Sequence, residues 1–83
     1  MALVHPEKLL ERITVDADVM VGKPTIRGLR ITVEQILQFM AGEGTVQELL
    51  DDYPELEKQD VQAALLYASR LVHEEQVFKV SGN

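Results

Sequence analysis

Apolar residues recur at helical spacing through the second half of the chain. In residues 32–41 and again in residues 45–53, they occupy positions i, i+3, i+4 and i+7. Each segment starts with a threonine, Thr32 or Thr45, and Gln35 or Glu48 follows three residues later, which is the pattern of a capping box. A third helix is predicted over residues 57–76. Glycines or a proline separate the three segments, so the pattern predicts three helices joined by short turns.

The third predicted helix carries more apolar residues than one buried stripe needs. Its predicted inner face consists of five residues: Val61, Ala64, Leu65, Ala68 and Val72. Leu66, Tyr67 and Leu71 lie outside that stripe. A wide apolar surface on a small domain indicates a second contact. We expect a homodimer through these three residues, with packing against the N-terminal segment as the alternative.

The first third of the chain has shorter patterns. Residues 6–10 predict one helical turn, residues 12–15 a short β-branched strand, and residues 16–18 a turn. Residues 20–31 predict a tight loop or hairpin, in which Gly22 and Gly28 allow positive φ. Together the patterns predict a mainly α fold: a three-helix helix-turn-helix bundle with a short N-terminal strand and a small β-hairpin. It would be one domain, with the strand and basic hairpin loop in residues 12–31, the bundle in residues 32–76 and a frayed tail in residues 77–83.

The amino-acid composition limits the kinds of catalytic and metal sites that the chain can form. The 83 residues fit one small domain, and the lack of cysteine excludes disulfides, thiolate metal sites and cysteine nucleophiles. His5 and His73 are far apart and have no metal-ligand spacing. Nothing in the sequence assembles a nucleophile, a base and an orienting group. We therefore expect a protein without enzymatic activity, metal or cofactor. There is no signal-peptide pattern and no apolar stretch long enough for a membrane span, so a cytoplasmic location is expected.

Charge is distributed unevenly along the chain. The net charge is −6, but residues 1–31 carry +1 and residues 32–76 carry −8. Residues 19–31 hold Lys23, Arg27 and Arg30 and no acid. A small basic loop is thus attached to an acidic body, which repels a phosphate backbone and favours a protein partner. The alternative is that the acidic residues only keep the protein in solution.

The three-helix order also allows DNA binding. In a helix-turn-helix domain the third helix would be the recognition helix, and Lys58, Gln59 and Gln62 lie near its start. Glutamine can read adenine, and lysine can contact guanine or phosphate, while the basic loop could contact phosphates. Glu57 and Asp60 in the same turn complement the helix dipole but repel phosphates. The alternative is a three-helix bundle that binds no DNA.

Several stretches of the chain match a known pattern. They are Asp16, residues 22–33, Gly42 and Gly44, residues 50–56, residues 60–65, and Tyr67 with Ala68. On these residues the chain resembles the Domain of Unknown Function 433 family of small bacterial and archaeal proteins. Glu57 stands where that family usually has a threonine or serine that caps the third helix. The loss of such a capping hydroxyl costs about 1 kcal/mol.

The resemblance implies a fold and a role. Members of the family look like homeodomain-like three-helix bundles, and several look like VapB-type antitoxins encoded beside a PIN-like ribonuclease toxin. We therefore expect an antitoxin-like protein that binds and neutralises a PIN-like toxin, with binding of its own operator DNA as a further expected activity. The alternative is a protein-interaction module of the same fold that binds no DNA.

Overall fold

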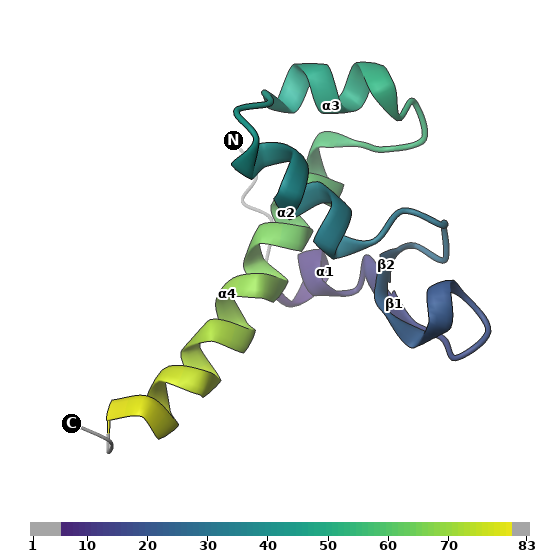
Figure 1. The fold of residues 1–83 in the computed structure, drawn as a ribbon. Helices are drawn as coiled ribbons and strands as arrows, with labels where there is room; N and C mark the ends of the chain where they lie inside the picture. The colour runs from purple at the N-terminus through teal and green to yellow at the C-terminus, as the bar shows by residue number, and fades with distance from the viewer. Residues whose placement is uncertain (1–5, 81–83) are drawn as a thin grey trace.

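The computed structural model describes residues 6–80, and the side chains of residues 7–73 within them. In chain order the elements are α1 (Pro6–Leu10), β1 (Ile13–Val15), the 3-10 turn η1 (Met20–Gly22), β2 (Pro24–Ile26), α2 (Val33–Ala41), α3 (Val46–Asp52) and α4 (Lys58–Val80). The helices α1, α2 and α3 lie around the first half of α4, and its second half extends away from them (Figure 1). The described part of the chain is thus mainly helical with a small hairpin, as the sequence predicts.

The strand β2 pairs with a segment on each side of it in the sequence. β1 pairs with β2 in an antiparallel register that places Ile13 opposite Ile26 and Thr14 opposite Thr25. The predicted strand is therefore present, and it forms the first arm of the hairpin. The turn predicted at Arg27 and Gly28 is also present: the N–H of Ile26 donates to the carbonyl of Ile31 over 3.0 Å, and Thr25 and Thr32 form an antiparallel bridge. A strand of three residues is stable only when it is paired, and the strand that pairs with β2 is β1.

The turn after β2 depends on Gly28. Arg27 and Gly28 have φ values of 49° and 74°, and the N–H of Leu29 donates to the carbonyl of Ile26 over 2.7 Å. Two consecutive positive φ values are typical of a type I′ turn, which favours glycine at its second central position. The positive φ predicted for Gly28 is confirmed.

Valine at position 28 should destabilise the fold. A β-branched side chain disfavours positive φ, so we expect Gly28→Val to lower the free energy of unfolding by more than about 1 kcal/mol. Gly42, with a φ of −85°, provides the matched control, because valine adopts that φ without strain. Urea unfolding of both variants tests this expectation. Equal unfolding midpoints for the two variants would show that the turn does not require glycine.

Both predicted capping boxes are confirmed. In α2, the N–H of Gln35 donates to Thr32 Oγ1 over 3.0 Å, and the N–H of Thr32 donates to Gln35 Oε1 over 2.8 Å. In α3, Thr45 and Glu48 make the same two hydrogen bonds, over 3.1 Å and 2.8 Å. These short helices therefore begin where the sequence places them, because the signal lies within four neighbouring residues.

The core lies between the turn after β2 and the helices α2, α3 and α4. It contains eight buried apolar residues: Ile26, Ile31, Val33, Ile36, Leu49, Leu56, Val61 and Ala64. Leu49 is the one buried residue of α3 and fixes that helix to the core. A helix of seven residues is not stable on its own in water, so α3 depends on this contact.

The helix α4 is longer than predicted, and its buried face is different. It ends at Val80, so residues 77–80 are helical and do not form a tail, while residues 81–83 lie outside the described residues. Val61 and Ala64 are buried as predicted, but Leu65 and Val72 are 48% and 49% exposed, so their prediction as inner-face residues was wrong. Ala63 is buried instead. The reason is that α1 also packs against α4, and this shifts the buried face away from Leu65.

Candidate functional site

The start of α4 contains a buried carboxylate, Asp60, among buried apolar residues. Its side chain is fully inaccessible to solvent, and Val61, Ala63 and Ala64 beside it are buried too. A buried carboxylate is tolerated only when cations and hydrogen-bond donors surround it. Asp60 therefore marks the place where the fold brings charged groups together.

Two arginines and one backbone N–H satisfy Asp60. Arg12 Nη1 donates to Oδ1 over 2.9 Å, and Arg27 donates through Nε to Oδ1 over 3.1 Å and through Nη2 to Oδ2 over 2.9 Å. The N–H of Glu57 donates to Oδ2 over 2.8 Å. We call Arg12, Arg27, Glu57 and Asp60 the Asp60 cluster. Arg12 comes directly before β1, and Arg27 comes directly after β2. The cluster therefore attaches the open end of the hairpin, where both arginines lie, to the start of α4.

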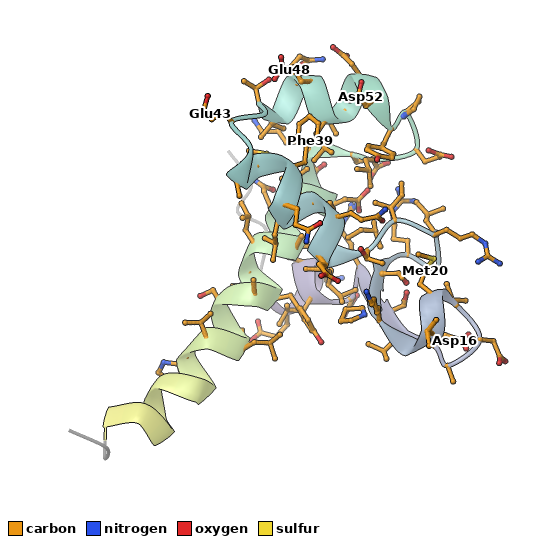
Figure 2. The ribbon with its side chains drawn as sticks, in the orientation of Figure 1. Asp16, Met20, Phe39, Glu43, Glu48 and Asp52 are labelled. Atoms are coloured by element: carbon orange, nitrogen blue, oxygen red, sulfur yellow. The ribbon has the colours of Figure 1, made fainter. Side chains whose placement is uncertain are left out.

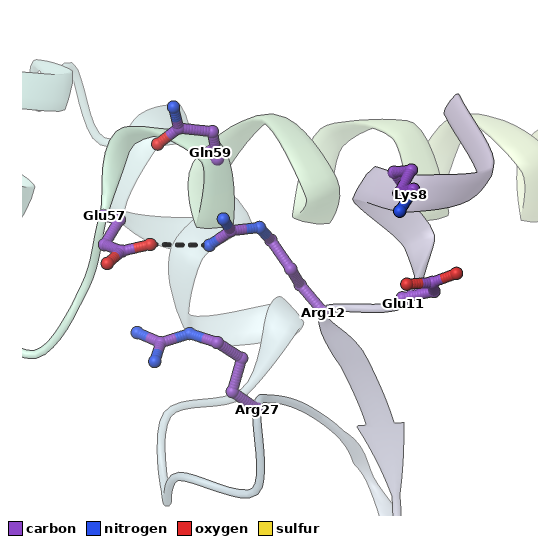
Figure 3. A pocket seen from close by; sticks show the side chains of 6 residues that line it. All are labelled: Lys8, Glu11, Arg12, Arg27, Glu57 and Gln59. Atoms are coloured by element: carbon purple, nitrogen blue, oxygen red, sulfur yellow. Dashed lines mark hydrogen bonds and ion pairs between the residues drawn. The ribbon is translucent and has the colours of Figure 1, made fainter. Parts of the chain in front are cut away.

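Further contacts connect the cluster to the turn between α3 and α4. Arg12 Nη1 also donates to Glu57 Oε1 over 2.8 Å (Figure 3), and Arg27 Nη2 donates to the carbonyl of Glu55 over 2.6 Å. The Glu57 side chain is thus engaged with Arg12, and the N–H of Glu57 is satisfied by Asp60 three residues later. This is one half of a capping box, so α4 starts without the threonine or serine that a complete box would need.

The surroundings of Asp60 favour its charged form. Burial by itself raises the pKa of this carboxyl, but hydrogen bonds from Arg27, from the N–H of Glu57 and from Arg12 outweigh it and hold the pKa below its ordinary value. The pKa of Arg12 is raised by its hydrogen bonds to Glu57 and Asp60, and that of Arg27 by its hydrogen bond to Asp60. Asp60, Arg12 and Arg27 therefore stay ionised at neutral pH, and their contacts have the character of a structural connection.

The three loop cations that the sequence predicts as phosphate contacts have different surroundings in the structure. Arg27 is held by Asp60, and Lys23 Nζ lies 3.1 Å from Glu34 Oε1 in an exposed ion pair. Arg30 is exposed and makes no ion pair with a side chain in the described part of the chain. Lys23 and Arg30 line one open cavity of 470 Å³ in the loop, whereas Arg27 is directed to Asp60 and does not line it.

The predicted recognition residues lie together on the surface of α4. Lys58, Gln59 and Gln62 are all exposed in its first turns. Gln59 also borders an open cavity of 560 Å³ beside the Asp60 cluster. Figure 3 shows the six residues that line this cavity: Lys8, Glu11, Arg12, Arg27, Glu57 and Gln59. Both signs of charge are present there, so the cavity is not a basic pocket.

An apolar groove lies beside the later turns of α4. Its volume is 240 Å³, and its apolar lining comes from Pro24, Val33, Leu37, Tyr67, Ala68 and Leu71, with Lys23 and Glu34 at its rim. Two of the three residues predicted as a dimer contact, Tyr67 and Leu71, therefore line this groove. Leu66, the third, is half-buried and does not line it.

The sequence did not reveal the unusual backbone of η1. Met20 and Val21 have φ values of 50° and 58°, a rare conformation for a β-branched residue such as valine. Val21 is 93% exposed at this position, on the opposite side of the hairpin from the Asp60 cluster. The only sequence signal is the neighbouring Gly22, which also has positive φ. Figure 2 places Met20 and Asp16 on this loop.

The described residues restrict two further kinds of function. Among the side chains that the structure describes, no three carboxylate or imidazole groups lie close enough to hold a metal ion. No helix within residues 6–80 combines the length and apolar character that a membrane span requires.

The comparisons with known proteins give a family but no function. No curated protein and no solved structure matches the chain. The family model described as "Protein of unknown function (DUF433)" matches residues 13–68, which include the hairpin, α2, α3, the start of α4 and most of the Asp60 cluster. Because this match covers more than half of the chain, the protein belongs to the DUF433 family.

Proposed function

We propose that this protein is antitoxin-like and acts by binding another protein, a PIN-like ribonuclease toxin, which it neutralises. The partner class comes from the resemblance of the family to VapB-type antitoxins. The observation that carries the choice of protein over nucleic acid is the state of the loop cations. Arg27 is held by the buried Asp60 and Lys23 pairs with Glu34, so two of the three loop cations already have an acidic partner.

The outer surface of the helical half supports the same choice. Glu43, Glu48, Asp51 and Asp52 are exposed on and beside α3, and Figure 2 shows Glu43, Glu48 and Asp52 around that helix. A ribonuclease must attract the phosphates of RNA and therefore presents cations of its own. An acidic surface complements such cations, increases the association rate and competes with RNA.

Charge reversal on α3 tests this proposal. Asp51→Lys with Asp52→Lys should weaken inhibition of a co-expressed PIN-like ribonuclease at least about tenfold, because close charge pairs across an interface contribute more than 1.4 kcal/mol. Both changes place cations at the end of a helix, where they favour the helix dipole, so the fold should be retained. The measurement is the concentration of this protein that halves RNA cleavage by the ribonuclease.

A control variant separates the α3 surface from net charge. Glu11→Lys with Asp18→Lys alters two exposed acids outside the helical half and changes the net charge by the same amount. It should inhibit the ribonuclease like the parent. Equal inhibition by the parent and both double variants would reject the α3 surface as the contact. No inhibition by the parent itself would reject the antitoxin function.

Operator DNA binding is the second candidate function. In this proposal α2, α3 and α4 form a homeodomain-like helix-turn-helix, and α4 is the recognition helix. The exposure of Lys58, Gln59 and Gln62 in the first turns of α4 favours it. Titration of an operator-like duplex at two salt concentrations tests it: loss of affinity on changing Gln59 and Gln62 to alanine supports base contacts. A lack of binding at low salt supports a function through protein contact alone.

A further inference from the structure

The second half of α4 extends beyond the other helices and strands that the structure describes (Figure 1). The radius of gyration is 13.9 Å, compared with roughly 12 Å for a compact domain of this length. Three large apolar side chains of α4 are exposed: Leu65 (48%) in its first half, and Leu71 (47%) and Val72 (49%) farther along. Apolar exposure at several positions of one helix on a small domain marks a surface that another molecule covers.

The groove beside these residues suits side chains more than a small organic ligand. Its 240 Å³ lies below the volume of about 300–1,000 Å³ that is usual for ligand pockets. Leu71 contributes to the groove and is also half exposed, and Leu65 and Val72 project from the same helix. The same surface therefore contains both a groove and exposed apolar side chains that can enter the groove of a second copy.

The charge distribution indicates which molecule covers this surface of α4, namely a second copy of the chain. The protein has a net charge of −6, so two copies repel one another over most of their surface. Residues 61–73, however, contain no acid, and Arg70 is their one residue with a permanent charge. This part of α4 therefore brings no acid to a contact between two copies, and Glu34, the acid that lines the groove, is paired with Lys23. In Figure 1 the second half of α4 extends away from α3.

We propose that this face of α4 is a homodimer contact in which the α4 helices of two copies cross antiparallel about a twofold axis near Ala68. Ala68 lies midway in sequence between Leu65 and Leu71. A twofold axis at Ala68 brings Leu65 of one copy opposite Leu71 of the other, and the reverse, so each groove receives a leucine. The small side chain of Ala68 allows the two helices to approach closely at the crossing. This inference goes beyond the proposed function, because it concerns a different surface and a different partner.

Sedimentation equilibrium of the full chain tests the proposal. The parent should be a dimer at micromolar concentrations, and Leu71→Glu and Val72→Glu should each raise the dimer dissociation constant at least tenfold, because each places a charge in an apolar contact. Val21→Glu is the matched control: Val21 is exposed but lies on η1, away from α4, so this variant should dimerise like the parent. Circular dichroism checks that each variant is folded.

A cysteine cross-link tests the position of the axis without relying on a disruptive change. The natural chain has no cysteine, so Ala68→Cys introduces a single thiol. Under mild oxidation it should form a disulfide-linked dimer in high yield, whereas Val21→Cys should not. A monomeric parent at high concentration overturns the proposal and leaves the face to a different protein. A dimer that persists in Leu71→Glu and Val72→Glu, or that fails to cross-link through Ala68→Cys, overturns it by placing the contact elsewhere.

Discussion

Asp60→Ala should lower the free energy of unfolding by about 2–5 kcal/mol, because hydrogen bonds to a charged group contribute roughly 1.5–3 kcal/mol and a helix cap contributes roughly 0.5–2 kcal/mol. The variant loses the acceptor of Arg12, Arg27 and the N–H of Glu57 in a single change. Arg27 then has no carboxylate partner, and α4 loses the hydrogen bond at its start. The measurement is urea unfolding followed by circular dichroism.

The control for this variant is Asp52→Ala, which removes an exposed carboxylate from the last turn of α3. Its unfolding midpoint should stay close to that of the parent, since surface changes have effects within about 0.5 kcal/mol. If Asp60→Ala unfolds at the same urea concentration as Asp52→Ala, the Asp60 cluster is not a major source of stability.

The carboxyl of Asp60 makes the free energy of unfolding depend on pH. Because the pKa of Asp60 is lower in the folded protein than in the unfolded chain, its contribution is complete above the unfolded value of about 3.9. The contribution is lost as the pH falls through the lower folded pKa. The difference in stability between parent and Asp60→Ala should therefore be constant near neutral pH and should narrow below about pH 4.

Leu49→Ala should be the second severe change, with an expected loss of about 2–5 kcal/mol. Leu49 is 1% exposed and is the buried residue that holds α3 against the core. Because α3 is too short to persist alone, we expect its amide hydrogens to exchange faster in the variant even where α2 and α4 stay protected. Urea unfolding and hydrogen exchange measure the two effects.

Leu50→Ala is the comparison for this variant, because Leu50 is a half-buried leucine in the same helix. It should cost clearly less, since its truncation leaves no closed cavity. Equal losses from the two changes would indicate that α3 is held by its whole inner surface and not mainly by Leu49.

The sequence predicted what is encoded by near neighbours. The capping boxes of α2 and α3 each depend on residues three positions apart, and the positive φ of Gly28 depends on one turn. The Asp60 cluster could not be predicted in this way, because Asp60 is separated from Arg27 by 33 positions and from Arg12 by 48. A signal was nevertheless present: an acidic residue followed at once by Val61, Ala63 and Ala64 in an apolar helical stretch needs a buried partner.

The errors along α4 have a related cause. Periodicity identifies an apolar stripe but not the element that covers it, so it could not show that α1 packs against α4 and shifts the buried face to Ala63. For the same reason, the sequence could not show that Arg27 is directed to Asp60, while Lys23 and Arg30 line a different cavity. Lys23 also lies beside Glu34 on α2.

The Asp60 cluster also means that the folding unit is larger than the region shared with the family. The family match begins at Ile13, one residue after Arg12, and it stops at Ala68, within α4. A fragment cut at these limits would keep Asp60 and Arg27 but would lose the second guanidinium that neutralises the carboxylate, together with α1 and the end of α4. Expression of such a minimal domain would therefore isolate an incompletely neutralised core. The boundaries for any fragment of this protein are better chosen from the charge balance around Asp60 than from the limits of sequence similarity.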